Sequence, residues 1–261
     1  MRNALGSLAL VASLSLSAAG QQTQSDNSFK WSGPISAGSW IRVSDMNGGV
    51  TVGAASGPDV QVTATKRWRR GDPATVRIET KKFGDNVVVC ALWGERSTCD
   101  ERGAHNNENR GNRNDVNVEL NVLVPRGVKI AANTVNGSLT VDGATSEVEA
   151  ETVNGEVDVS TTGGPVNAST TNGSVRARMG HVETEDRMNF ETVNGNVIVE
   201  FTGDFGGDVD LSTVNGSLNT NFEITLSGRL DPKHLRAHIG KPGGPRMKLE
   251  TVNGNVELRK R

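Results

Sequence analysis

Three glutamates come closest, among the residues of this sequence, to a spacing that could support catalysis. Glu147, Glu149 and Glu151 occupy alternate positions, so they lie on one face of a predicted strand. Carboxyl pairs can hydrolyse sugar chains, and a polysaccharide-active β-helix enzyme is therefore one alternative function. Outward glutamates at this spacing more often keep a strand soluble, and no nucleophile elbow, phosphate-binding loop or kinase motif occurs. We therefore expect no catalytic residues and no enzyme activity.

Two histidines four residues apart offer the nearest approach to a metal site. If Pro232 began a helical turn, His234 and His238 would face the same side of it. The sequence lacks a third ligand and the glutamate of the HExxH motif. We therefore expect a solvated turn there, with no bound metal and no cofactor.

The densest charge cluster consists of Lys66, Arg67, Trp68, Arg69 and Arg70. It could contact an anionic polysaccharide or lipid head groups, with the indole ring as a stacking platform. Alternatively, it is a solvated strand end whose charges protect the edge of a sheet. The whole chain carries 28 basic and 30 acidic residues, a net charge of −2, which argues against a nucleic-acid partner.

The first twenty residues have the composition of a secretory signal peptide. Arg2 precedes an apolar stretch from Ala4 to Leu16, and small residues at 17–19 suit a cleavage site. No later run is apolar for long enough to span a membrane as a helix. The sequence therefore predicts an exported protein that is not an integral membrane protein.

The chain has two cysteines, Cys90 and Cys99, only nine residues apart. A close pair in an exported protein ordinarily forms a disulfide, which here would close a short loop. The alternative is half of a metal site, but no neighbouring pair of His or Cys completes four ligands. We therefore predict a disulfide.

A tetrapeptide repeat predicts the strands that must position these side chains. Thr-Val-Asn-Gly occurs five times, and Thr-Thr-Asn-Gly adds a sixth corner. Successive asparagines are 18, 18, 22, 21 and 38 residues apart, the last interval being about twice the others. Such a period is typical of stacked, near-identical units. The corner asparagines are Asn136, Asn154, Asn172, Asn194, Asn215 and Asn253.

Apolar and polar residues alternate on both sides of each corner. Val148, Ala150 and Thr152 precede Asn154, for example, and Val157 follows it. This period of two predicts half-buried strands with their apolar side chains inward. Glycines mark the opposite end of each repeat, so each repeat holds two short strands.

Two all-β architectures fit this pattern. In a parallel β-solenoid, each repeat forms one coil of about 18–22 residues, and equivalent residues stack along the axis. In an antiparallel β meander, each Asn-Gly pair closes a hairpin. A hairpin needs only Asn-Gly, whereas stacking favours the recurrence of the whole tetrapeptide. We therefore predict the solenoid.

Stacked corners would align their side chains in columns. By the alternation, the corner asparagines point inward with the threonines, and their amides would form a structural ladder. The valine before each asparagine then faces outward, as ordinary strand propensity or as a contact stripe for a partner. These valines are Val135, Val153, Val193, Val214 and Val252.

The N-terminal part is less regular than the repeats. Residues 29–125 predict irregular coils that cap one end of the solenoid, and residues 126–261 form the regular coils of the same single domain. The polar stretch 93–115 predicts a loop that the disulfide ties at its base.

The repeated corners resemble a bacterial family of exported proteins named "putative adhesins", a domain of unknown function. The run from Asp115 to Val128, the segment from Gly228 to Gly240 and the surroundings of the two cysteines share this resemblance. It covers roughly residues 38 to 258. The resemblance implies a β-solenoid with an adhesive role, and it defines neither a ligand nor catalytic residues.

These observations lead us to expect an exported structural and binding protein of the bacterial envelope. Its location would be periplasmic, cell-surface or secreted, and its partner an envelope protein or a glycan. A further alternative is an accessory protein of the envelope-stress response that binds another envelope protein.

Overall fold

The computed structural model describes residues 20–25, 27–107, 114–203, 205–227, 231–240 and 243–261. Except for Gly20, the expected signal peptide lies outside these residues. The described chain forms strands and one short 3-10 helix, η1 (Pro73–Thr75). The strands are β1 (Gln21–Gln24), β2 (Ser28–Pro34), β3 (Trp40–Ser44), β4 (Val50–Ala54), β5 (Asp59–Arg67), β6 (Val76–Phe83), β7 (Asn86–Trp93), β8 (Thr98–Asp100), β9 (Gly103–His105), β10 (Asn117–Val124), β11 (Lys129–Asn133), β12 (Leu139–Ala144), β13 (Val148–Glu151), β14 (Val157–Gly163), β15 (Val166–Asn172), β16 (Val175–His181), β17 (Arg187–Asn194), β18 (Val197–Phe201), β19 (Gly207–Asn215), β20 (Leu218–Thr220), β21 (Ile224–Leu226), β22 (His234–Ile239), β23 (Arg246–Asn253) and β24 (Val256–Lys260).

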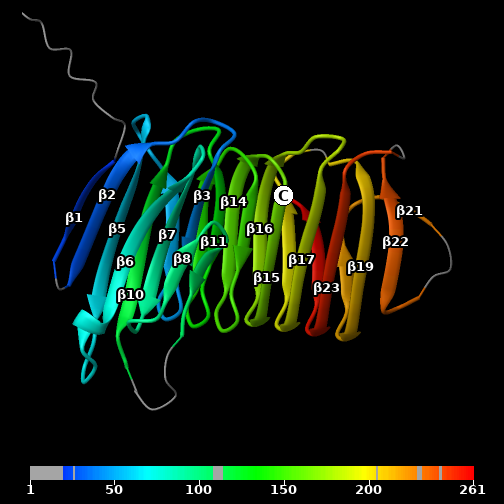
Figure 1. The fold of residues 1–261 in the computed structure, drawn as a ribbon. Helices are drawn as coiled ribbons and strands as arrows, with labels where there is room; N and C mark the ends of the chain where they lie inside the picture. The colour runs from blue at the N-terminus through cyan, green and yellow to red at the C-terminus, as the bar shows by residue number, and fades with distance from the viewer. Residues whose placement is uncertain (1–19, 26, 108–113, 204, 228–230, 241–242) are drawn as a thin grey trace, which may run out of the picture.

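Two long sheets run side by side along the molecule (Figure 1). Sheet 1 has the order β1-β2-β5-β10-β4-β12-β14-β16-β18-β24-β20, and sheet 2 the order β21-β22-β19-β23-β17-β15-β13-β11-β3-β7-β6. Each regular coil gives one strand to each sheet, and neighbouring coils pair in parallel. The parallel β-solenoid is therefore confirmed, and the antiparallel meander is wrong for the repeats.

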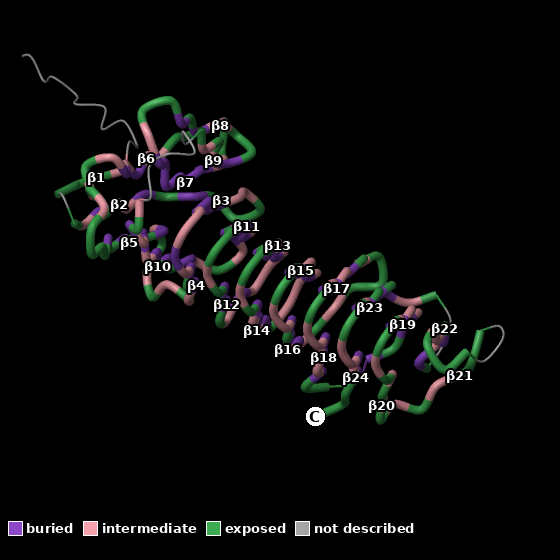
Figure 2. Tube along the Cα trace, turned by 90° about the horizontal axis from the view of Figure 1, so that it is seen from below, coloured by how far each residue is buried: buried purple, intermediate pink, exposed green. Residues whose placement is uncertain are grey.

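The core lies between the sheets and is made of small stacked side chains. Val148 pairs with Val166 and Ala150 with Ala168, so equivalent inward residues lie directly over one another. All four are buried. In Figure 2 the exposed positions gather at the corners of the coils, and buried positions recur along the strands. Strand pairing along the axis therefore compensates for a core poor in aromatic residues.

The recurrence of Thr and Gly in every corner has a common cause. Each corner Thr is buried, and its hydroxyl donates to the carbonyl of the corner Gly in the adjacent coil, as from Thr152 to Gly137 at 2.9 Å. A Cβ on Gly155 would lie 2.0 Å from that same carbonyl oxygen, so only glycine allows the approach. Equivalent Thr-to-Gly bonds form from Thr134, Thr170, Thr192, Thr213 and Thr251.

The coils do not stack in chain order at the C-terminal end. Strands β23 and β24 insert between the β17–β18 coil and the β19–β20 coil. The double interval before Asn253 therefore contains β21 and β22. The chain then returns, and its last coil lies between the two coils that precede it in the sequence. Strand β22 pairs antiparallel with β19 and so differs from the regular coils.

The N-terminal part is a cap built largely of antiparallel strands. In sheet 1, β1, β2, β5 and β10 pair antiparallel, and in sheet 2, β6 pairs antiparallel with β7. Only β3 and β4 stack in parallel on the first regular coil. Buried residues of the cap and of the repeats belong to one continuous hydrophobic cluster.

Candidate binding surfaces

The corner asparagines form a hydrogen-bonded ladder on the surface. The Asn154 amide donates to the Oδ1 atom of Asn136 at 2.9 Å and accepts from the Nδ2 atom of Asn172 at 2.8 Å. The ladder continues through Asn194 and Asn253 and ends at Asn215. The inward orientation was wrong, because these side chains are exposed. The inward alternation ends at the Thr, where the chain begins to turn.

The corner valines lie beside this ladder and are exposed. Between 37% and 62% of their surface is accessible, with Val214 the most exposed. The sixth corner carries Thr171 in the same place. The edge of the solenoid therefore presents an apolar stripe next to a row of amides, and both repeat at the spacing of the coils.

A disulfide-bonded hairpin covers part of the outer face of sheet 2. Strands β8 and β9 pair antiparallel, and Cys99 at the hairpin forms the predicted disulfide with Cys90 on β7. These cysteines pack with Val88 and Leu92 in a small second cluster. The loop expected over residues 93–115 is thus partly a packed hairpin, and residues 108–113 lie outside the described chain.

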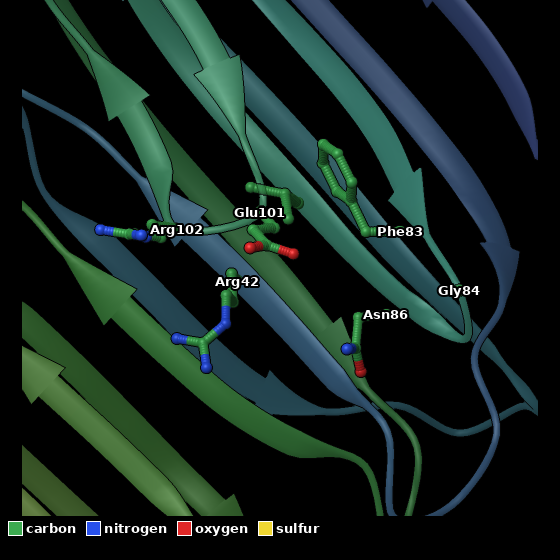
Figure 3. Close-up of a pocket in the computed structure, with 7 residues that line it drawn as sticks. Arg42, Phe83, Gly84, Asn86, Glu101 and Arg102 are labelled. Carbon is green, nitrogen blue, oxygen red and sulfur yellow. The ribbon is translucent and has the colours of Figure 1, made fainter.

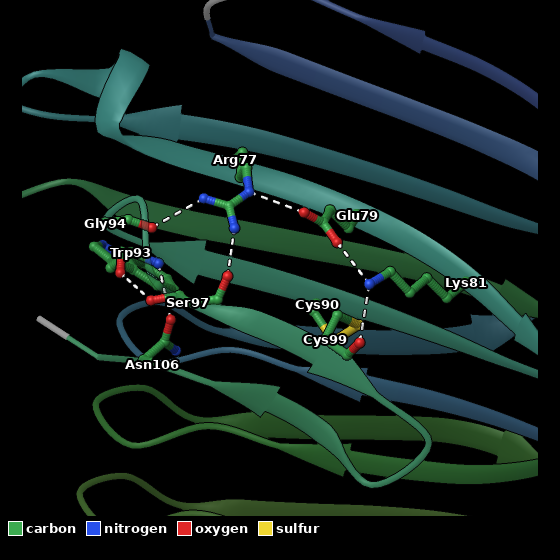
Figure 4. Close-up of polar contacts among 9 residues, drawn as sticks. All are labelled: Arg77, Glu79, Lys81, Cys90, Trp93, Gly94, Ser97, Cys99 and Asn106. Carbon is green, nitrogen blue, oxygen red and sulfur yellow. Dashed lines mark hydrogen bonds and ion pairs between the residues drawn. A yellow bond between two sulfur atoms is a disulfide. The ribbon is translucent and has the colours of Figure 1, made fainter.

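Two charged side chains of β6 hold the hairpin base (Figure 4). The Arg77 guanidinium donates to the Gly94 carbonyl at 2.9 Å and to the Ser97 carbonyl. Lys81 donates to the Cys99 carbonyl at 3.0 Å. Glu79 bridges both cations; burial alone would raise its pKa, but the bonds from Arg77 and Lys81 outweigh burial and lower the pKa. The hairpin is therefore fixed to sheet 2 by charge as well as by the disulfide.

A hollow of about 680 Å³ lies beneath the tip of this hairpin (Figure 3). Arg42 borders it from β3, and Glu101 and Arg102 border it from the hairpin turn. Phe83 and Asn86 line the side formed by β6 and β7. An aromatic ring, two guanidinium groups, a carboxylate and an amide together suit a polar ligand group.

An aromatic and cationic cluster adjoins the hollow. The Arg42 guanidinium lies 4.8 Å and the Lys129 ammonium 5.3 Å from the centre of the Trp40 ring. Arg42 also pairs with Glu149 at 3.3 Å, and Lys129 with Glu147 at 2.8 Å. Two of the three glutamates considered for catalysis are thus paired with cations.

The basic cluster at 66–70 is only partly on the surface. Lys66 is buried, and its ammonium donates to the carbonyls of Pro73 and Val76. Its contact with an external anion is therefore excluded in this fold. Arg67, Trp68, Arg69 and Arg70 are exposed. Backbone amides at 69–71 surround the Asp115 carboxylate and lower its pKa, the Gly71 amide contributing most.

The two spaced histidines lie on strand β22, so the expected turn was wrong. His234 bonds to Asp210 at 2.7 Å, and His238 contacts Asp208 through Nδ1 and Ser227 through Nε2, the latter at 2.7 Å. The sequence did not lead us to predict these contacts of the two histidines. Aspartates occupy alternate positions on β19, and His, Arg and His occupy alternate positions on β22. Complementary side chains at the same period of two are the pattern of paired strands.

Comparison with known proteins places this fold. Residues 41–259 match the family described as Toastrack DUF4097. The chain belongs to the Toastrack DUF4097 family. No curated protein matches it.

A solved structure shows the same fold as this Toastrack chain. A "putative cell adhesion protein" from Clostridium sporogenes superposes with a TM-score of 0.51 at 10% identity, covering 89% of this chain and 99% of that one. A "putative adhesin" from Bacteroides fragilis gives a TM-score of 0.39 at 12% identity, covering 91% and 98%. At 10% identity the likeness to the Clostridium sporogenes protein concerns the fold alone.

The described residues of the Toastrack chain lack two features. They contain no helix that is long and apolar enough to cross a membrane. They also contain no group of three or more His, Cys, Asp or Glu side chains arranged to hold a metal ion.

Proposed function

We propose that this Toastrack protein is an exported, adhesin-like structural and binding protein of the bacterial envelope, acting without catalysis. The observation that carries this proposal is a solenoid whose exposed corner side chains repeat from coil to coil, together with a hollow that two arginines border. Repeated rows on a stiff frame provide many identical contacts, which suits binding to an extended partner.

The hairpin supports the exported location. Its disulfide ties the hairpin strand β8 to β7 of sheet 2, and such bonds persist in oxidising compartments. The apolar N-terminal segment of the sequence agrees with this location. Periplasm, cell surface and external medium all satisfy these observations.

The most enzyme-like arrangement in the described residues favours binding over catalysis. Ser227, His238 and Asp208 form a hydrogen-bonded chain like that of a serine hydrolase. Catalysis also needs backbone donors for the oxyanion, and the Ser227 amide already donates to the Arg236 carbonyl at 2.8 Å. A fluorophosphonate probe should therefore leave Ser227 unlabelled, and stoichiometric labelling would contradict the non-catalytic proposal.

The binding proposal is tested with the full mature chain. A glycan array and a pull-down from an envelope extract should each be run with wild-type protein and two variants. Arg42→Ala/Arg102→Ala alters the hollow, and Val153→Ser/Val193→Ser alters the stripe. We expect wild-type protein to retain a glycan or an envelope protein, and at least one variant to lose it. If folded wild-type protein retains neither, the proposal is wrong.

A further inference from the structure

Two arginines lie side by side at the far end of sheet 2 without an acidic partner. Arg187 on β17 and Arg246 on β23 are direct neighbours in the parallel register. Both are exposed, and in the part of the chain that the structure describes neither forms an ion pair. Like charges directly opposite each other on neighbouring strands are destabilising. An anion bound between them would remove this repulsion.

The nearby cations and acids are already engaged with one another. Lys248 pairs with Glu191 at 3.1 Å and also with Glu250, and Arg236 pairs with Asp210 at 3.0 Å. Asp208 follows Arg246 in the same row, but its carboxylate contacts His238. Among the described residues that line this surface, these two guanidinium groups are therefore the cations without an ion-pair partner.

The arginine pair borders a hollow of about 430 Å³ that crosses strands β17, β23, β19 and β22. Its other polar lining consists of Asp208, Asp210, Ser227, Arg236, His238 and Lys248. The hollow lies at the opposite end of sheet 2 from the hairpin, several coils away (Figures 1 and 2). It is therefore separate from the hollow bordered by Arg42 and Arg102.

The mixture of charges selects the chemistry of the ligand. Guanidinium forks bind carboxylates through two parallel hydrogen bonds, and neighbouring strands place the backbones of these two arginines about 4.8 Å apart. Asp208 and Asp210 would repel a uniformly charged polyphosphate, but carboxylates accept hydrogen bonds from sugar hydroxyls. The Ser227 hydroxyl adds a further polar contact at the same edge.

We propose that this hollow binds an acidic glycan, with uronic-acid carboxylates on Arg187 and Arg246 and sugar hydroxyls toward the aspartates. This inference rests on the proposed binding function and names its ligand class. The free protein keeps the repulsion between the two arginines, and the bound glycan relieves it.

The test measures binding of oligogalacturonate to the full mature chain by calorimetry at low ionic strength, with neutral dextran as the comparison probe. Arg187→Ala/Arg246→Ala should weaken binding by on the order of tenfold or more, because two charge-assisted contacts are lost. Arg96→Ala/Arg176→Ala removes the same charge from exposed arginines elsewhere and should bind almost as wild type does. Wild-type binding should weaken steeply with added salt.

The possible results distinguish failure of this glycan site from failure of the proposed envelope-binding function. Equal oligogalacturonate binding by both double variants overturns the site and leaves the envelope-binding function standing. Failure of wild-type protein to bind oligogalacturonate, while it still retains a partner in the array or pull-down, overturns the ligand class. Unfolding of Arg187→Ala/Arg246→Ala is monitored in parallel. Loss of the repulsion should leave the melting temperature of this variant equal to or above that of wild type. The variant Arg187→Lys/Arg246→Lys tests the guanidinium fork without changing the charge.

Discussion

Asp45 occupies the place of the repeated threonine in the first corner, and Asp45→Thr should stabilise the protein at neutral pH. Asn47 pairs with Asn136, which aligns Asp45 with Thr134. The Asp45 side chain is buried; Oδ1 accepts from the Met46 amide at 2.8 Å, whereas Oδ2 has no partner. A buried, half-satisfied carboxylate is costly.

The repeat identifies the acceptor that a threonine would reach. In the regular corners, the Thr hydroxyl donates to the carbonyl against which the corner Gly packs. Gly48 packs against the Val118 carbonyl, since a Cβ on Gly48 would lie 2.0 Å from that oxygen. Thr at position 45 should therefore donate to the Val118 carbonyl, a bond worth about 1 kcal/mol.

The size of the stabilisation expected for Asp45→Thr follows from the pKa of Asp45. Burial raises this pKa from 3.8 to about 7, and Glu119 adds to the rise, against the lowering effect of the Met46 and Asn47 amides. Because the pKa of the folded state is the higher one, the proton binds the folded state more tightly. Stability is then greatest below about pH 4 and is lost as pH rises to about 7. Three pH units correspond to about 4 kcal/mol, an order-of-magnitude upper value.

The assay is urea unfolding between pH 4 and pH 8 of wild type, Asp45→Thr and the reciprocal control Thr152→Asp. Asp45→Thr should gain roughly 2–4 kcal/mol at pH 8 and little at pH 4. Thr152→Asp should lose stability, with the loss growing as pH rises. A wild-type stability that increases from pH 5 to pH 8, or an Asp45→Thr variant that is less stable at pH 8, refutes the reasoning.

Three further predictions concern the ladder, the corner glycines and export. Asn154→Ala removes two ladder bonds, whereas Asn196→Ala removes one acceptor, so the first should lower the free energy of unfolding by about 1 kcal/mol more; equal melting points would contradict the ladder's contribution. Gly155→Ala should cost roughly 3 kcal/mol because its Cβ meets a backbone carbonyl, whereas Gly57→Ala, which meets open space, should be near neutral in the same denaturation series. Mass spectrometry of exported protein should find cleavage after Ala19 or Gly20, and an intact N-terminus in the exported fraction would count against the signal peptide.

The repeat itself could be predicted from the sequence because its causes are local. Alternation such as Val148, Ala150 and Thr152 shows which side of a strand is buried, whatever the strand pairs with. The recurrence of Thr with Gly155 and its equivalents indicated stacking, because each corner contacts an identical corner one coil away. The disulfide followed from two nearby cysteines and the expectation of export.

The candidate surfaces could be predicted only in part. Exposure of the corner valines followed from the alternation of inward and outward positions along the strand. This alternation fails once the chain turns, so the asparagines were assigned to the wrong side. Lys66 belongs to a basic run in sequence, yet strand alternation directs it inward to two carbonyls. The hollows combine residues from distant strands, and no local pattern brings Arg42 to Arg102 or Arg187 to Arg246.

The order of the last coils shows what only the tertiary structure decided. The corner at Asn253 is identical to the others, so its residues accept any corner as a neighbour and cannot specify which one. Its position between Asn194 and Asn215 depends on the antiparallel pairing of β22 with β19, where histidines and arginine meet aspartates. The sequence by itself determined that the coils stack, because each repeat carries its own inward side and its own corner. Their order depended on contacts between segments far apart in the chain, and these exist only in the folded protein.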